Sequence, residues 1–225
     1  MKKTILFLAL IASALVYSQD FNVAIKVGAG SSDYDFDDLE YVNPETNTAV
    51  RIRDIGSIFS YNIGGYARYN FGVLPLGVRL GLQYTNLGGK VEVFEHATNF
   101  NRHITERNHR LDIPLTLTGN IKWFRVLAGV TYAIDIGRSQ EVRNYLDDTF
   151  VQTGRFDFVV NSPSQNYWTY SLGLGADFNT WAIDILWEDP LSQDISGSRE
   201  AGVFNFGPNA KQVTINLSFL ILKKD

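Results

Sequence analysis

Hydrophobic and polar side chains alternate along much of the chain, most clearly between residues 168 and 188. In Trp168–Phe178, apolar or aromatic side chains occupy every even position, and Thr, Ser, Gly and Asp lie between them. A period of two predicts a β-strand with two unlike faces. The alternation resumes in Trp181–Glu188 after only two residues, which predicts a hairpin. The pairs that this hairpin implies are Phe178 with Trp181, Leu174 with Ile185, and Leu172 with Trp187.

The apolar face of this hairpin has aromatic ends and an aliphatic centre. Trp168 and Trp187 mark one end, and Phe178 and Trp181 mark the other. Strands of membrane barrels show this distribution because amphipathic rings prefer the membrane–water interface. The first arm is about 33 Å long, or about 23 Å when tilted, which matches the roughly 25 Å apolar band of such barrels. We therefore expect the apolar face to meet lipid and the face with Gly and Asp to line an interior.

Six further segments alternate in the same way: Phe21–Gly30, Phe59–Asn70, Leu76–Thr85, Leu111–Thr118, Phe124–Asp135 and Gln212–Ile221. With the two hairpin arms they make eight strands, joined by alternating long and short connections. Short periplasmic turns, long extracellular loops and an even strand count are typical of outer-membrane barrels. The sequence predicts an all-β fold, an eight-stranded antiparallel up-and-down transmembrane β-barrel made by residues 19–225.

The first eighteen residues resemble a secretory signal. Lys2 and Lys3 precede the apolar run Ile5–Val16, and Val16-Tyr17-Ser18 is a suitable cleavage site. The run is too short to span a bilayer as a helix. We predict that residues 1–18 are a signal peptide. The chain has no cysteine, so it can form no disulfide.

The composition limits the classes of function that the protein can have. The formal net charge is −4, from 20 basic and 24 acidic residues, which argues against nucleic-acid binding. A soluble secreted β-barrel that binds a small ligand is the alternative with the apolar face inside. Glycine weakens an exposed strand face unless a small residue is needed there, so the glycines of the polar face favour a narrow interior. These glycines are Gly28, Gly64, Gly77, Gly81, Gly129, Gly173 and Gly175.

Charged residues also fall on the polar face. An eight-stranded barrel is filled by its own side chains, and a buried charge without a partner is costly. We therefore expect a charge-compensated plug, with a small pore as the alternative. Its basic members are Lys26, Arg68, Arg79, Arg110 and Arg125, and its acidic members are Asp112, Asp135, Asp177, Asp184 and Glu188.

The strand Leu111-Asp112-Ile113-Pro114-Leu115 resembles a motif of the PorT-like, porin-family outer-membrane β-barrel domain. Leu127–Val130 and Trp187–Leu191 are similar to that family's fifth strand and seventh-strand exit. The resemblance implies an eight-stranded outer-membrane barrel and supplies no catalytic residues. Pro114 departs from a regular strand, because a missing N–H inside a closed barrel usually marks a bulge.

Candidate chemistry lies in the predicted long loops. His96, His103 and His109 could bind a metal, or they could serve a lipid A-modifying enzyme at the rim of the barrel. Their spacings of seven and six residues match no zinc motif. We interpret them as solvated loop histidines, with His103 and His109 on one strand face. Residues 33–37 resemble the start of a calcium loop, and the pattern then fails. We interpret this segment as a solvated acidic loop, with cation bridging to lipopolysaccharide as the alternative.

Two loop segments continue the alternation, Lys90–Glu95 and Arg155–Val160. They predict a ribbon that protrudes from the membrane, whose free edges could accept a strand from a surface protein. We expect a monomer with a structural or surface-interaction role, in contact with outer-membrane lipid and lipopolysaccharide. We expect no enzymatic activity, cofactor or metal.

Overall fold

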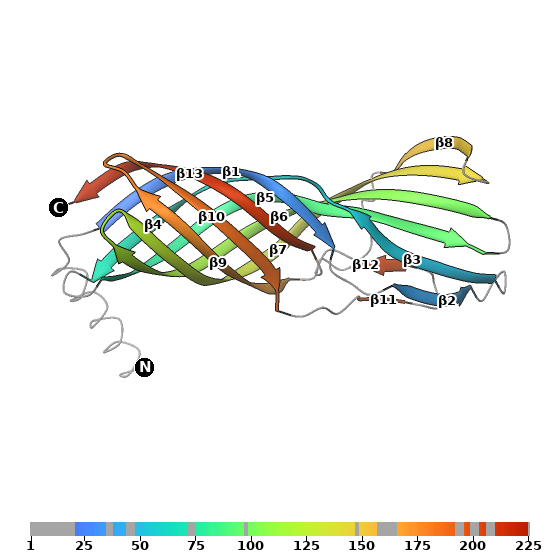
Figure 1. Cartoon of the computed structure of the whole chain (residues 1–225), viewed down its shortest axis with the longest axis horizontal. Coiled ribbons are helices and arrows are strands. Elements are labelled where there is room, and N and C mark those ends of the chain that lie inside the picture. Colours follow the sequence, from blue (N-terminus) through green and yellow to red (C-terminus); the bar gives the residue numbers. More distant parts are fainter. Residues whose placement is uncertain are drawn as a thin grey trace.

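Eight strands form a closed antiparallel ring in the computed structural model, which describes residues 21–34, 38–43, 48–71, 75–96, 99–146, 149–156, 166–191, 196–198, 203–205 and 210–224. The ring consists of β1 (Phe21–Tyr34), β4 (Ile58–Phe71), β5 (Leu76–Glu95), β6 (Phe100–Ile121), β7 (Phe124–Leu146), β9 (Tyr167–Asp177), β10 (Trp181–Pro190) and β13 (Ala210–Lys224). Each strand pairs with the next, and β13 pairs with β1 to close the ring (Figure 1). The existence of all eight predicted strands is confirmed. The predicted signal peptide lies outside the described residues.

The hairpin of β9 and β10 has the register that the alternation predicts. Leu174 pairs with Ile185, and Leu172 pairs with Trp187. The N–H of Phe178 donates to the carbonyl of Trp181 over 2.8 Å, and the two rings stack with centroids 3.9 Å apart. The two-residue turn therefore closes the hairpin as expected.

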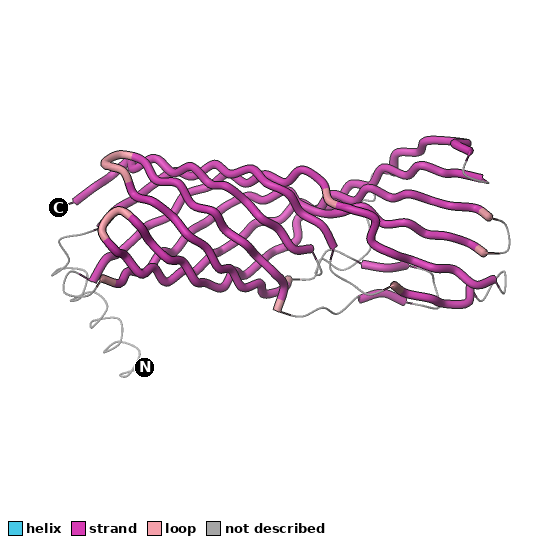
Figure 2. Tube along the Cα trace, viewed as in Figure 1, coloured by secondary structure: helices cyan, strands magenta, loops and turns pink. Residues whose placement is uncertain are grey.

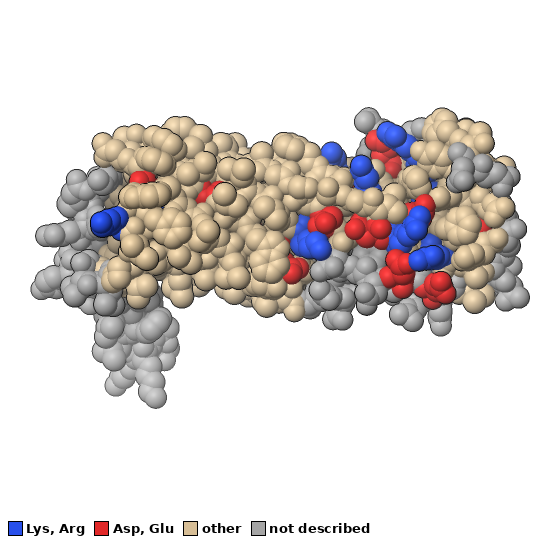
Figure 3. Space-filling model, in the orientation of Figure 1, with Lys and Arg blue, Asp and Glu red and all other residues tan. Residues whose placement is uncertain are grey.

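The faces of the ring are oriented with apolar side chains outside. Leu174 is 52% exposed and Ile215 is 55% exposed, whereas Asp184 and Arg125 are fully buried. Figure 3 shows few charged side chains over the barrel part of the face drawn. The alternative of a soluble barrel around an apolar core is therefore wrong for this fold.

Three strands of the ring continue far beyond it, where long loops were predicted. β6 begins at Phe100 rather than at Leu111, and it pairs with β5 as far as Glu95. With β2 (Leu39–Asn43), β3 (Thr48–Gly56) and β8 (Thr149–Phe156), the outer halves of β5, β6 and β7 form an external sheet in the order β2-β3-β5-β6-β7-β8 (Figure 2).

The predicted ribbon is confirmed at residues 90–95, which belong to β5. In the second predicted segment, residues 155 and 156 end β8, and residues 157–160 lie outside the described part of the chain. β11 (Ser196–Ser198) and β12 (Val203–Asn205) pair only with each other among the described strands. No helix among the described residues is long and apolar enough to cross a membrane.

The predicted bulge at Pro114 is wrong. The register between β5 and β6 is the same on both sides of the proline, and the ladder merely lacks the pairs at Gly81 and Leu82. Gly81 leaves room for the ring, since a Cβ built on it would lie 3.0 Å from the Cγ of Pro114. The strand accommodates the missing N–H without inserting a residue.

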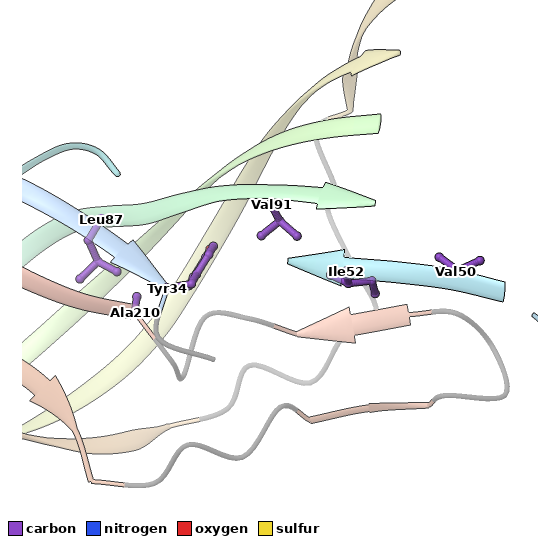
Figure 4. Packing of buried hydrophobic residues seen from close by; sticks show 6 residues of the cluster. All are labelled: Tyr34, Val50, Ile52, Leu87, Val91 and Ala210. Carbon is purple, nitrogen blue, oxygen red and sulfur yellow. The ribbon is translucent and has the colours of Figure 1, made fainter. Parts of the chain in front are cut away.

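A small hydrophobic cluster joins the ring to the external sheet. Its members come from β1, β3, β5 and β13, and Figure 4 shows them between the end of the ring and the sheet. They are Tyr34, Val50, Ile52, Leu87, Val91 and Ala210, all at most 5% exposed. Because their strands are distant in sequence, burial of this cluster fixes how the sheet leaves the ring.

Candidate functional site

The ring interior contains a chain of five ion-paired residues. At its centre is Arg125, which is fully buried and bridges Asp177 and Asp184. Asp177 also accepts from Nη1 of Arg68 over 2.9 Å, and Asp184 accepts from Nη1 of Arg79 over 3.0 Å. We call this set the Arg125 chain. It connects β4, β5, β7, β9 and β10 across the interior, so it braces opposite walls of the ring.

A second group, the Arg110 cluster, lies nearer the external sheet. Arg110 donates from Nε to Asp112 over 3.0 Å and also pairs with Glu188. Hydroxyl and amide groups also donate to these two carboxylates. Their donors are Gln83, Thr85, Thr169 and Gln212. Each of these partners occupies an interior position that alternation could have identified.

One member of the predicted plug has a different partner. Asp135 pairs with Arg138 over 2.5 Å rather than with one of the five predicted bases. A bulge in the pairing of β6 with β7 sets Gly137 opposite His109 and Asp135 opposite Arg110. The extra residue brings Asp135 and Arg138 to the same face, as a β-bulge does. Lys26 is buried as expected, and its ammonium donates to Gln83.

A buried polar group at the mouth of the ring was not predicted. The hydroxyl of Tyr34 donates to Glu106 over 3.0 Å, and Nε2 of Gln140 donates to the same carboxylate over 2.7 Å. Burial raises the pKa of Glu106 above its ordinary value, against the opposing effects of Arg138 and of these hydrogen bonds. Glu106 continues the even, inward positions of β6, so extending the strand in the sequence would have identified it.

The three histidines lie apart from one another. His103 and His109 are on β6, not in a loop, and they share its outer face as predicted. His103 contacts the Glu92 carboxylate over 3.1 Å, whereas His109 contacts the hydroxyl of Tyr84 over 2.6 Å. His96 follows the end of β5 and packs against a neighbouring ring. No group of three or more potential ligands that could hold a metal is found among the described residues.

Charged and aromatic side chains cover the outer face of the external sheet. Glu92 pairs with Arg53 and accepts from Asn101 over 2.6 Å. Burial alone would raise the pKa of this carboxyl. The hydrogen bonds from Asn101, Arg53 and His103 outweigh that effect and lower the pKa below its ordinary value. Arg143 and Glu141 make a further, exposed pair on the same face.

The acidic segment after residue 30 is only partly described. β1 continues to Tyr34, four residues beyond its predicted end, and Tyr34 is buried in the hydrophobic cluster. Asp33 is therefore a strand residue rather than part of a solvated loop. Residues 35–37 of the calcium-like pattern lie outside the described part of the chain.

A closed ring of strands with an apolar outer face and an ion-paired interior defines the class of membrane β-barrels. The chain matches the family model described as "Outer membrane protein beta-barrel domain" over residues 4–217, and it belongs to that family. The protein is therefore located in the outer membrane.

Three solved structures are similar to this chain at low sequence identity. Neisserial surface protein A is 11% identical with a TM-score of 0.40, covering 88% of this chain and 96% of its own. The transport unit of the Escherichia coli autotransporter AIDA-I is 9% identical with a TM-score of 0.22, covering 88% and 90%. CdiB from Acinetobacter baumannii is 10% identical with a TM-score of 0.18, covering 88% and 60%. No curated protein matches the sequence.

Proposed function

We propose that the protein is an up-and-down transmembrane barrel that does not conduct and that displays the external sheet at the cell surface to bind a partner. The external sheet is the observation that carries this proposal. Strands that only cross a membrane need about 9–11 residues, whereas β6 has 22 and β7 has 23. The additional length builds a surface beyond the lipid, and that surface is what a partner would contact.

The proposed orientation places the short turns in the periplasm. Three connections at the end of the ring opposite the sheet are short: residues 72–75, 122–123 and 178–180. This asymmetry is typical of outer-membrane barrels, in which the elaborated end faces outward.

Single cysteines test the orientation, because the chain has none of its own. We expect Arg143→Cys, on the external sheet, to react with a membrane-impermeant maleimide in intact cells. Lys122→Cys, in the short turn between β6 and β7, is the matched control and should react only after the outer membrane is permeabilised. Labelling in the reverse pattern would invert the topology and remove the basis for a surface role.

The absence of conduction follows from the interior. The Arg125 chain and the Arg110 cluster cross a ring of eight strands, whose interior has room for little besides side chains. Planar-bilayer recording of the purified protein should give no steady conductance. Stable channel openings of uniform size would support the small pore instead.

Partner binding is assigned to the outer face and the β8 edge of the sheet. Among the described strands, β8 pairs only with β7, so its other side is open to strand addition. Phe150 is 54% exposed beside Tyr145, and such aromatic pairs are frequent in binding surfaces. A photo-crosslinker at Arg143→Cys should give one discrete adduct on intact cells. The same crosslinker at Lys122→Cys should give none, and equal adducts at both sites would contradict the assignment.

Lipopolysaccharide is the expected lipid contact. Arg107 lies on the outer face of β6, two residues beyond His109, and donates to the carbonyl of Phe59 and to Asn86, both over 3.1 Å. A cation just beyond the aromatic ends of the strands is placed to meet lipid phosphates. We expect a monomer and assign no catalytic role. Membership of the PorT-like group is supported by the strand at residues 111–115.

A further inference from the structure

Among the residues that the structure describes, basic side chains outnumber carboxylates around the Arg125 chain. The basic side chains there are Lys26, Arg68, Arg79 and Arg125, and the acidic ones are Asp177 and Asp184. Nearer the external sheet the balance is reversed, because two bases lie among four carboxylates: Arg110 and Arg138 among Glu106, Asp112, Asp135 and Glu188. The Arg125 chain and Lys26 therefore have two more cations than anions, and an incompletely compensated buried charge is costly.

Among the described residues of the interior, Arg79 is the arginine with the most unpartnered donors. It is 6% exposed, and its single ion-pair partner is Asp184, which it shares with Arg125. Its Nε and Nη2 atoms are buried and have no hydrogen-bond partner among the described residues. The guanidinium carbon lies 4.1 Å from the ring centroid of Tyr66, so one flat side is covered. Two N–H donors along the edge remain available to an acceptor.

Lys26 brings a second positive charge to the same place. Its ammonium is buried and donates to the neutral Oε1 of Gln83. Arg79 lies close enough to repel Lys26, and the attraction of Asp184, Glu188 and Asp112 opposes this repulsion. Two cations held close together inside a ring of low polarity favour the binding of a negative charge beside them.

We propose that the ring binds one small monovalent anion, of the size of chloride or bromide, held by the Nε and Nη2 donors of Arg79 beside Lys26. One bound charge reduces the local excess of positive charge and provides an acceptor for both N–H groups of Arg79. The ligand must be small because the interior is crowded. A Cβ built on Gly28, for example, would lie 2.2 Å from Oδ1 of Asn216 and 2.5 Å from Nδ2 of Asn62.

Thr116 provides a matched pair of test variants. It is 7% exposed and lies directly across from Arg79 in the β5–β6 register. Side chains at such positions have Cβ atoms about 4.5–5.5 Å apart, so an aspartate there would reach the guanidinium. Thr116→Asp supplies the missing negative charge and should replace the ion. Thr116→Asn has the same shape without the charge and should keep the ion site.

The experiment uses the full chain, unfolded in urea and refolded into detergent in either sodium bromide or sodium methanesulfonate at equal concentration. We expect a higher urea midpoint in bromide for the natural sequence and for Thr116→Asn, and no difference for Thr116→Asp. Crystals grown in bromide should show one anomalous peak within hydrogen-bond distance of Nε and Nη2 of Arg79.

Two results would overturn the proposal. The first is a diffraction map with no anomalous peak inside the ring, together with equal midpoints in the two salts. The second is a bromide effect of the same size in Thr116→Asp, which would place ion binding elsewhere. Should Thr116→Asp fail to fold, diffraction from the natural sequence decides alone.

Discussion

Gly81 on β5 lies against Pro114 on β6, and a Cβ built on Gly81 would be 3.0 Å from the Cγ of the proline. The same Cβ would lie 3.1 Å from the carbonyl oxygen of Gly65. The missing side chain on one strand thus accommodates the ring on the other. This relationship explains how a proline fits within a closed ring without a bulge, where it would otherwise be confined to edges.

Gly81→Ala should therefore destabilise the barrel. The added methyl group meets backbone and a rigid proline ring, neither of which can rotate away, so we expect a loss of about 1–3 kcal/mol. The measurement is the urea midpoint of unfolding from lipid vesicles, followed by the gel mobility of unheated samples. Gly119→Ala is the control, because no atom lies within 4 Å of a Cβ at that position. Equal losses for the two variants would contradict the explanation.

Removal of Arg125 should be more costly than removal of an exposed arginine. Arg125→Met leaves Asp177 with only Arg68 and Asp184 with only Arg79 among the described ion pairs, and Asp184 is fully buried. Breaking a buried ion pair from one side typically costs about 3–5 kcal/mol. We expect the free energy of unfolding, calculated from the urea midpoint, to fall by that amount.

Arg143→Met is the control for the loss of an arginine. Arg143 pairs with Glu141 over 3.1 Å, but its side chain is 57% exposed. Exposed pairs contribute at most about 1 kcal/mol. A loss for Arg125→Met as small as that for Arg143→Met would mean that the interior network does not brace the ring.

Glu106 should make the stability of the barrel mouth depend on pH. Its pKa is raised in the folded protein by burial, so the folded state holds the proton more tightly than the unfolded state. The stability that this group contributes is full below its ordinary pKa and is lost as pH rises through the raised value. Arg138 and Asp135 face the same site and act on it as well.

Glu106→Gln keeps the shape of the side chain and removes the titration. We expect the urea midpoint of the natural sequence to fall, relative to that of Glu106→Gln, as pH rises from about 4.5. Urea midpoints of both proteins, measured roughly once per pH unit from about pH 4 to about pH 8, test this. A difference between the two proteins that does not change with pH would show that burial does not shift this group.

The sequence was most informative where each strand carries one apolar and one polar face. Alternation identified all eight strands and the inward position of Arg125 and Asp184, because lipid selects the outer face at every second residue. It could not pair the interior charges. Asp135 was assigned to the plug, but the bulge after it shifts the face of the next residues, and such a shift leaves no composition signal.

The external sheet was harder to predict for a physical reason. Beyond the lipid, both faces of a strand meet polar surroundings, so the outer halves of β6 and β7 lose the apolar alternation that marks the ring. Residues 90–95 of the neighbouring β5 kept it. The hydrophobic cluster could not be predicted from the sequence either, because Tyr34 and Ala210 meet through pairing between distant strands.

The lipid-facing belt gives the last prediction. Leu174 lies between the aromatic ends of β9 and is 52% exposed, whereas Val42 on the external sheet is 59% exposed. Replacing each residue by arginine should therefore show whether lipid or water contacts that position, because the two side chains are similarly exposed. Leu174→Arg should cost about 2–4 kcal/mol, because the guanidinium must enter the apolar band.

Val42→Arg should change stability by no more than about 0.5 kcal/mol, because the same group there stays in water. Urea midpoints in vesicles measure both variants, and the same variants in detergent micelles provide a second comparison. Since a micelle can deform around a charge, the penalty at Leu174 should shrink there while the effect at Val42 stays constant. Equal penalties at the two positions would mean that the exposed apolar face of β9 does not contact the bilayer.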